Sequence, residues 1–448
     1  MRTKSALILA AALLVGGCAG PSPRDAVAGP EPAPDGNVVL ISIDGYRASY
    51  FDSNPSPTLH SLAASGVRAQ WMIPAFPTIT EPNHYTLLTG LYPDHHGIVN
   101  NDMSDPYIQR GRFLMGKPSS TESPRWWSEA IPIWVSLQRK GIPTAEMSWP
   151  GSYGRIHGTR PDFSEVGKPV GNISRETATV IDWLALPAGK RPQLTLVHYE
   201  SVDQMGHVHG PESSQVEEAI QQVDHAIGDI VAALKRNGTY DTTDLIIVSD
   251  HGMTAVAPDH QIYLDDLVDT GTVSTISLGP LASISPHPTD AGRRSTGELL
   301  APHAHMRCWR KGDMPAYLHY GTNSRIPPIE CLADPGWLVT THDQAARATY
   351  TMRGDHGYDS RDPDMRALFI AEGPSFRKGV VVPPFPNVDV YPLLAHIFHI
   401  APEPNDGSMQ PLEPALSAAT DTAQQERAPT YPDNPGRRHG TRRGNAAD

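Results

Sequence analysis

The stretch NVVLISID, residues 37–44, is a run of apolar and β-branched residues that ends in an acid. Such a run is typical of a strand buried on both faces of a parallel sheet. The stretch DLIIVSD, residues 244–250, repeats the pattern, and PQLTLVHYESVD, residues 192–203, contains a third strand. Between them, residues 215–235 place apolar side chains at helical spacing. This alternation predicts an α/β fold with a mostly parallel central sheet flanked by helices.

The rest of the chain adds elements to the same layered plan. Residues 57–66 predict a short helix closed by a glycine, and residues 388–400 predict a core helix. Strands are expected within residues 143–151 and over residues 367–373. Residues 254–350 interrupt this rhythm with stretches rich in Pro, Gly, Ser and His, which predicts an inserted subdomain or cap.

Length and charge narrow the class of protein. The 448 residues have room for two or three average domains, although large α/β enzymes often fold around one sheet. Lys and Arg number 36 against 49 Asp and Glu, a net charge of −13. This balance argues against binding to a nucleic-acid polymer, because such proteins normally present a basic face. The 20 histidines, beside so many acids, make metal sites worth seeking.

Both ends of the chain differ in composition from the middle. Residues 1–17 are typical of an export signal, with a basic start and an apolar core too short to span a membrane. Cys18 resembles the cysteine of a bacterial lipobox, which is lipidated after cleavage; an ordinary cleavable signal is the alternative. Residues 18–36 predict a tether rich in Pro, Ala and Gly, and residues 415–448 a disordered tail. The folded domain is therefore expected over residues 37–414.

Acids and histidines gather in one predicted structural context. In open α/β sheets, ligands bind beyond the carboxyl ends of the strands. Asp44, Asp203 and Asp250 are expected there, because each follows an apolar run that predicts a strand. Mixed oxygen and nitrogen ligands suit zinc better than magnesium. Two such ions can clamp the attacking and leaving oxygens of a phosphoryl displacement. The residues that form this predicted site are Asp44, Asp203, His207, Asp250, His251 and His356.

The stretch FPTITEPNHYTLLTG, residues 76–90, predicts a helix that begins near the same site. Thr80 stands where an N-cap belongs, and Pro82 falls in the first turn. A helix N-terminus favours an anion such as phosphate, so Thr80 is also placed to act as a metal-activated nucleophile. Asn101, an uncharged amide nearby in sequence, is a candidate donor to a phosphate oxygen.

At these residues the chain resembles the nucleotide pyrophosphatase/phosphodiesterase family, within the alkaline phosphatase superfamily. The resemblance implies an alkaline-phosphatase-like α/β fold. In this fold residues 37–414 form the catalytic domain, and residues from about 254 to 350 form the insert. The motifs that carry it are VLISIDGYR, FPTITEPNHYTLLTGLYPDHHGIVNN, DQMGHVHGP, VSDHGM and GDHGYD.

The resemblance also implies a role for each matching residue. Thr80 matches the nucleophile that forms a covalent phospho-threonine intermediate, and Asn101 matches the asparagine that holds the phosphoryl oxygens. Two Zn²⁺ ions are the implied cofactors. The ligands implied for one zinc are Asp44, Thr80, Asp250 and His251, and those for the other are Asp203, His207 and His356.

One position departs from many nucleotide-cleaving members of the family. They carry an aromatic residue after the nucleophile, where it can stack on a base, and here that residue is Glu81. Two interpretations stay open: the carboxylate points away as a helix N-terminal acid, or it receives a cationic group such as choline. Phe163 is a candidate for the missing aromatic wall.

We therefore expect a two-zinc phosphodiesterase or pyrophosphatase that favours nucleotides and their derivatives. The alternatives are a choline-phospholipid headgroup phosphodiesterase, a phosphomonoesterase or phosphonate hydrolase of the same superfamily, and a binding protein without turnover. A monoester specialist needs additional positive charge, typically from an Arg or a third metal ion. No such residue is identifiable in the sequence, and Arg47 or the insert is where one could still be found.

Export would determine where this chain works and how its cysteines behave. We expect a bacterial periplasmic or cell-surface lipoprotein, held to the membrane by its N-terminal lipid anchor, with a small-molecule phosphodiester as its substrate. In an oxidising compartment Cys308 and Cys331 can pair across a loop.

Overall fold

The central sheet carries the strands that the apolar runs predict. The computed structural model describes residues 36–108, 111–152, 154–165 and 171–418. Within them an eight-stranded sheet has the order β19-β2-β18-β9-β1-β8-β6-β7. Its strands are β1 (Asn37–Ile43), β2 (Val67–Ala69), β6 (Thr144–Met147), β7 (Phe163–Ser164), β8 (Leu194–Tyr199), β9 (Thr243–Val248), β18 (Phe369–Glu372) and β19 (Val380–Val382).

The five strands from β9 to β7 run parallel, as predicted. Strand β18 is antiparallel to both of its neighbours, so it is the reversed strand of the sheet. At the centre, Val39 of β1 pairs with Thr195 of β8 on one side and with Leu245 of β9 on the other. The three strands whose ends carry the predicted acids are therefore direct neighbours.

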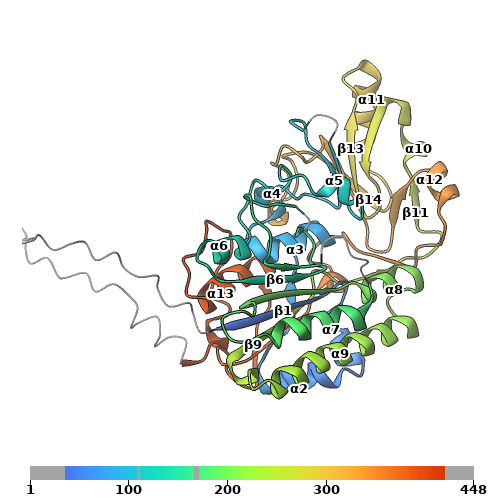
Figure 1. Cartoon of the computed structure of the whole chain (residues 1–448). Coiled ribbons are helices and arrows are strands. Elements are labelled where there is room, and N and C mark those ends of the chain that lie inside the picture. Colours follow the sequence, from blue (N-terminus) through green and yellow to red (C-terminus); the bar gives the residue numbers. More distant parts are fainter. Residues whose placement is uncertain (1–35, 109–110, 153, 166–170, 419–448) are drawn as a thin grey trace, which may run out of the picture. The chain divides into compact units, whose positions relative to one another are not determined.

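Helices cover both faces of this sheet (Figure 1). Successive residues of a strand point to opposite faces, so β1 contributes Val39 and Ile41 to one apolar core and Val38 and Leu40 to the other. One face packs against α2 (Pro57–Ser65), α7 (Ile173–Leu184), α8 (Ser201–His209) and α9 (Ser214–Arg236). The other packs against α3 (Thr80–Thr89), α6 (Ile133–Arg139) and α13 (Val390–Ile397).

The predicted insert holds a small sheet of its own, at the upper right of Figure 1. It is antiparallel, with the order β12-β13-β15-β14, and has a separate apolar cluster. A disulfide joins Cys308 to Cys331, which lie opposite one another on β14 and β15. The elements of the insert are β11 (Gln261–Tyr263), α10 (Leu264–Leu267), β12 (Val273–Ser277), β13 (Leu281–Pro286), α11 (Asp290–Leu299), β14 (Met306–Arg310), β15 (Ile329–Ala333), β16 (Leu338–Thr340) and α12 (His342–Arg347).

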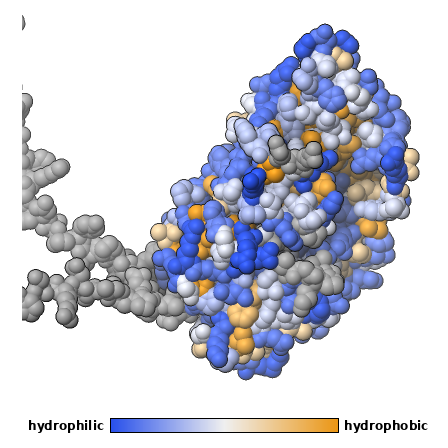
Figure 2. Space-filling model, turned by 45° about the horizontal axis from the view of Figure 1, so that its top comes forward, coloured by the Kyte–Doolittle hydropathy of each residue, from blue (hydrophilic) through white to orange (hydrophobic). Residues whose placement is uncertain are grey.

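Several short elements make up the rest of the described part of the chain. No helix among the described residues is both long and apolar enough to cross a membrane. On the face shown in Figure 2, hydrophilic residues predominate and apolar residues lie in small scattered groups. The remaining short helices and strands are α1 (Tyr50–Ser53), β3 (Met72–Ile73), α4 (Pro93–His96), β4 (Asp102–Ser104), β5 (Arg112–Leu114), α5 (Pro118–Thr121), β10 (Thr254–Ala255), β17 (Gly354–Asp355) and β20 (Phe385–Pro386).

A buried acid on the long helix α9 caps a second helix. Helix α2 begins with Pro57, and its own N-cap, Ser56, makes no capping hydrogen bond through its side chain. Instead, the carboxylate of Asp224 accepts hydrogen bonds from the backbone N–H groups of Thr58 at 3.0 Å and Leu59 at 2.9 Å. These donors have no partner inside their own helix, so Asp224 ties two helices of one layer together.

Replacing Asp224 by Ala should lower the free energy of unfolding by about 1–3 kcal/mol, because two buried N–H groups lose their acceptor. Denaturant unfolding of the purified protein measures this change. The matched control is Glu218→Ala, an exposed acid on the same helix, which should leave the midpoint almost unchanged. Equal effects of the two substitutions would contradict the capping role.

Candidate active site

The sheet brings the three predicted acids to one edge. Asp44 directly follows β1, Asp250 lies two residues beyond β9, and Asp203 stands in the first turn of α8, just after β8. Since these strands are adjacent and parallel, their carboxyl ends converge. Gly45, at φ +66°, allows this approach: a Cβ at that position would lie 2.9 Å from the Cα of Asp203.

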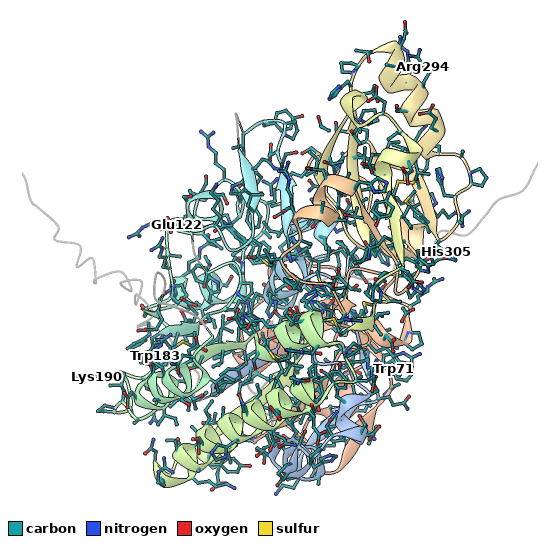
Figure 3. All side chains as sticks on the ribbon, turned by 90° about the vertical axis from the view of Figure 1, so that its right-hand side faces the viewer. Trp71, Glu122, Trp183, Lys190, Arg294 and His305 are labelled. Atoms are coloured by element: carbon teal, nitrogen blue, oxygen red, sulfur yellow. A yellow bond between two sulfur atoms is a disulfide. The ribbon has the colours of Figure 1, made fainter. Side chains whose placement is uncertain are left out.

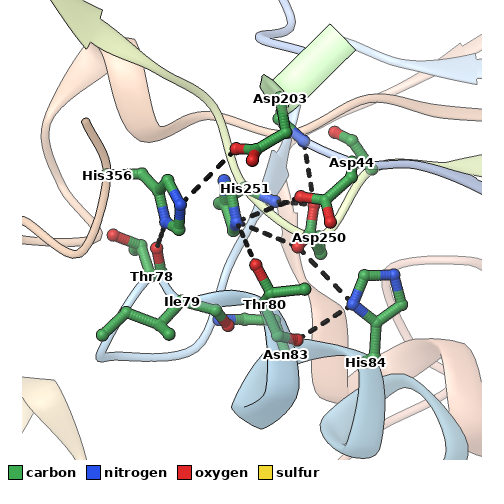
Figure 4. A network of polar contacts seen from close by, with 12 residues as sticks. Asp44, Thr78, Ile79, Thr80, Asn83, His84, Asp203, Asp250, His251 and His356 are labelled. Carbon is green, nitrogen blue, oxygen red and sulfur yellow. Dashed lines mark hydrogen bonds and ion pairs between the residues drawn. The ribbon is translucent and has the colours of Figure 1, made fainter. Parts of the chain in front are cut away.

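The six predicted acids and histidines form one connected cluster, of which Figure 4 labels Asp44, Asp203, Asp250, His251 and His356, and His207 contacts Asp203. The ligand atoms of Asp203, His207 and His356 lie within 4.8 Å of one another, and so do those of Asp44, Asp203 and His251. Asp203 therefore belongs to both groups. Asp250 joins through its Oδ2 atom, which lies 2.9 Å from Nε2 of His251.

The three histidines of the cluster are oriented in the same way. The Nδ1 atom of each lies 2.9 Å from a backbone carbonyl oxygen: Gly354 for His207, Gly252 for His251 and Thr78 for His356. A carbonyl only accepts, so each ring donates from Nδ1 and turns Nε2 toward the carboxylates. Histidines that ligate metals are commonly held by this kind of second hydrogen bond.

Thr80 lies at the same cluster, but it does not cap its helix as predicted. The N-cap is Ile79 and Thr80 is the first helical residue, with its Oγ1 atom 3.3 Å from Nε2 of His251. The acceptor at this helix end is Asn101, whose Oδ1 atom takes the backbone N–H of Glu81 at 2.9 Å. This long-range cap leaves the hydroxyl of Thr80 directed at the cluster. Pro82 stands in the first turn, as expected.

Burial and mutual repulsion set the charges of this cluster. Burial raises the pKa of Asp44, and the neighbouring Asp250 raises it further. Burial alone would lower the pKa of His207, but the carboxylate of Asp203 outweighs it and raises this pKa to about 10. In turn, burial acts to raise the pKa of Asp203, whereas His207 holds it well below its usual value. The carboxylates therefore require nearby positive charge.

The donor set fits zinc. Within the described part of the chain, one buried oxygen on each acid makes no well-formed hydrogen bond and faces a histidine Nε2: Oδ1 of Asp44 at 3.4 Å, Oδ1 of Asp203 at 3.5 Å and Oδ2 of Asp250 at 2.9 Å. Buried polar atoms normally have a partner, and a cation supplies one to a carboxylate. Carboxylate oxygens together with histidine nitrogens match the ligands that zinc takes in catalytic sites.

Two buried histidines that border the cluster, His84 and His198, were not predicted from the sequence as site residues. His84 lies with Nδ1 at 2.9 Å from the Thr80 carbonyl and Nε2 at 2.9 Å from Ser42 Oγ. His198 lies with Nε2 at 2.9 Å from Asp44 Oδ2. Each had a sequence signal: His84 follows Thr80 by one helical turn, and His198 is a polar residue in a buried strand.

Glu81 and Phe163 occupy different surroundings. Glu81 is only 1% exposed, so it does not extend into solvent as an ordinary helix N-terminal acid does. Phe163 lies on the edge strand β7, with its ring 6.1 Å from that of Trp183. Figure 3 places Trp183 near Lys190, at the left of the domain in that view. None of these contacts joins Phe163 to the acid and histidine cluster, and its role as the aromatic wall stays a prediction.

Several predictions fall on residues that the structure does not describe. Residues 1–17, Cys18 and the tether up to residue 35 lie outside the described part of the chain, as does the tail from residue 419 onward.

The raised pKa of His207 should make metal binding at this cluster depend on pH. In the metal-free protein the ring is protonated below about pH 10, whereas a metal-bound ring must be neutral, so a bound zinc ion would displace a proton at neutral pH. The apparent affinity should rise about tenfold per pH unit for each released proton. Calorimetric titration of zinc in two buffers of different ionisation enthalpy measures this release.

Two variants provide the comparison for that titration. His207→Gln should reduce the proton release without abolishing it, because Asp250 outweighs burial and raises the pKa of the second candidate ligand His251 as well. His225→Gln should leave the release unchanged, since His225 forms an exposed i,i+4 pair with Asp229. Binding heats that do not change with the buffer in the unsubstituted protein would contradict the prediction.

The known proteins that are similar to this chain in sequence are enzymes. Residues 38–359 match the family model described as type I phosphodiesterase / nucleotide pyrophosphatase. Human ectonucleotide pyrophosphatase/phosphodiesterase family member 5 is 35% identical over 385 residues, which are 85% of this chain and 78% of that protein. A bis(5'-adenosyl)-triphosphatase of Xenopus laevis is 35% identical over 83% of this chain and 80% of its own length.

Solved structures agree with the sequence relatives. The human family member 5 structure superposes with a TM-score of 0.79 at 34% identity, covering 85% of this chain and 100% of that one. A murine family member 5 structure, described as an inactive threonine-to-alanine variant in complex with AMP, gives a TM-score of 0.80 at 32% identity, with the same coverage. The neighbours share the alkaline-phosphatase-like fold, which confirms the fold prediction.

Proposed function

This chain belongs to the type I phosphodiesterase / nucleotide pyrophosphatase family, and from that membership we propose that it hydrolyses phosphodiester or pyrophosphate bonds of nucleotides and their derivatives. We propose further that it uses two zinc ions and a phospho-threonine intermediate. The observation that carries this proposal is the position of Thr80, whose hydroxyl faces His251 at 3.3 Å beside the buried acids.

Zinc would be held by side chains that the cluster already brings together. One ion would take Asp44, Thr80, Asp250 and His251, and the other Asp203, His207 and His356. When bound, zinc would lower the pKa of the threonine hydroxyl and offset the charge of the phosphoryl oxygens. The three histidines present their Nε2 atoms for this purpose.

In the proposed reaction the Thr80 oxygen attacks phosphorus, and the bond to the leaving alcohol or phosphate breaks. Water then attacks the phospho-threonine, the Thr80–phosphorus bond breaks, and a phosphate monoester leaves while the hydroxyl regains its proton. Asn101 accepts the Glu81 N–H through Oδ1. That contact orients the amide so that Nδ2 is the donor for a phosphoryl oxygen, as a group that stabilises developing charge must be.

Relatives support nucleotides as the substrate class. One is named for splitting bis(5'-adenosyl) triphosphate, and a solved neighbour binds AMP after a threonine was replaced by alanine and activity was lost. A monoester specialist would need an additional cation. Arg47 is engaged by Glu212 and by Asp364 at 3.2 Å, so it does not supply that charge. The phosphomonoesterase alternative is thereby disfavoured.

Export remains part of the proposal on sequence grounds. The basic and apolar start of the chain, with Cys18 as the lipidation site, supports an exported lipoprotein of the periplasm or cell surface. The disulfide between Cys308 and Cys331 supports an oxidising compartment, because such bonds are rare in reducing ones.

Thr80→Ala should reduce kcat/KM for an aryl ester of a nucleoside monophosphate by roughly 10³- to 10⁶-fold, since the nucleophile is lost. Thr80→Ser should retain a measurable part of the activity. The matched control is Thr89→Ala, which removes a hydroxyl at the far end of the same helix that donates to the Tyr85 carbonyl and accepts the Leu91 N–H. Near-normal turnover by Thr80→Ala with zinc bound would exclude Thr80 as the nucleophile.

The substrate class is tested by two esters that share a leaving group. The zinc-loaded protein should show a kcat/KM at least about tenfold higher for the aryl nucleoside monophosphate than for an aryl phosphocholine. Glu81→Gln should leave that preference in place. If phosphocholine is the better substrate and Glu81→Gln abolishes its advantage, Glu81 receives a cationic headgroup and the nucleotide assignment is wrong.

A further inference from the structure

His198 occupies an unusual place for a polar residue. It lies in β8, between apolar residues of a strand buried along its length, and its side chain is 7% exposed. Its strand partner on β1 is Ser42, two residues before Asp44. Burying an imidazole costs free energy unless its polar atoms find partners, so the partners indicate why the residue is there.

Both ring nitrogens of His198 face oxygen atoms. Nδ1 lies 3.0 Å from the carbonyl oxygen of Ser148, and Nε2 lies 2.9 Å from Oδ2 of Asp44. Ser148 itself has a φ of +57°, an uncommon conformation outside glycine, and follows strand β6. The ring thus spans from the carboxylate of Asp44 to the backbone at the end of a neighbouring strand.

Because of the contact with His198, the two oxygens of Asp44 face different partners. Oδ2 points to His198, while Oδ1 lies 3.4 Å from Nε2 of His251 and has no hydrogen-bond partner among the described residues. A carboxylate free to rotate would offer either oxygen to the cluster. With Oδ2 held by His198, Oδ1 is the atom that faces the place where a metal ion would bind.

Asp250, the other acid assigned to this ion, is held differently. Its Oδ1 accepts backbone N–H groups, from His251 at 2.9 Å and from Gly45 at 3.2 Å. Backbone donors remain whatever side chains are substituted. Asp44 instead depends on a side chain for its orientation, so the first ion has one ligand whose position a single residue controls.

We propose that His198 is a positioning residue for the metal ion that Asp44, Thr80, Asp250 and His251 would hold: the hydrogen bond between its Nε2 atom and Asp44 Oδ2 directs Oδ1 at the ion. This inference rests on the proposed function, because it assumes that the cluster binds metal. His198 is not itself a ligand in this arrangement, since its Nε2 is occupied by the bond to Asp44.

A pair of amide substitutions separates the two nitrogens of the ring. The terminal amide of glutamine reaches the position of Nε2, whereas that of asparagine reaches only the position of Nδ1. His198→Gln therefore keeps a hydrogen-bonding group for Asp44, and His198→Asn keeps one for Ser148. His198→Phe keeps an aromatic ring of somewhat larger volume and has neither group.

The experiment measures zinc affinity and stoichiometry of the full-length protein, by competition with a chromophoric chelator, and thermal unfolding of the metal-free forms. We expect two zinc ions in all variants. His198→Gln should bind both within about threefold of the unsubstituted protein, whereas His198→Asn and His198→Phe should bind one of the two about 10- to 100-fold more weakly. The metal-free melting temperatures show whether each variant is folded.

The other results contradict either this proposal or the function on which it rests. Equal losses for the Gln and Asn variants would mean that the ring only fills space, and undiminished zinc binding by the Phe variant would mean that Asp44 needs no partner. Zinc binding by the unsubstituted protein without turnover would overturn the proposed function while leaving the affinity test of His198 intact. An unsubstituted protein that binds no zinc would contradict both.

Discussion

Three neighbouring carboxylates, of which Asp44 and Asp250 are buried and Asp203 is partly buried, are the constraint on which the rest of this structure depends. Asp44, Asp203 and Asp250 stand at the ends of adjacent parallel strands, and their charges repel one another in surroundings poor in water. Without cations nearby, such a group would destabilise the folded chain. His207 and His251, whose pKa values these carboxylates raise, supply positive charge in the metal-free protein. The anchored Nδ1 atoms of His207, His251 and His356 leave Nε2 for a metal ion. Stability and chemistry therefore use the same atoms.

The fold and most of the cluster could be predicted because their signals are local. An apolar run with an acid at its end states both where a strand lies and which side chain reaches its carboxyl edge, as with residues 37–44 and 244–250. The long helix α9 follows from its periodicity alone. Neighbouring acids were expected to meet because parallel strands share an edge.

What could not be predicted depends on contacts between distant segments. Thr80 was assigned the cap of its own helix, since a hydroxyl at a helix start normally acts on nearby backbone. The acceptor comes instead from Asn101, a residue 20 positions away. His198 gave no decisive signal, because a lone histidine in an apolar strand is equally consistent with an ordinary core residue. Only the register of β1 against β8 places it beside Asp44.

Asp203 belongs to both groups of candidate ligands, and this sharing links the two halves of the site. A cation bound to either group immobilises the same side chain that the other group needs, and it also repels a second cation nearby. Loading is then a coupled equilibrium, in which the affinity of each half depends on the occupancy of the other by a single reciprocal factor. In such a protein a partly filled site is a thermodynamic state with its own properties, and not an average of empty and full molecules.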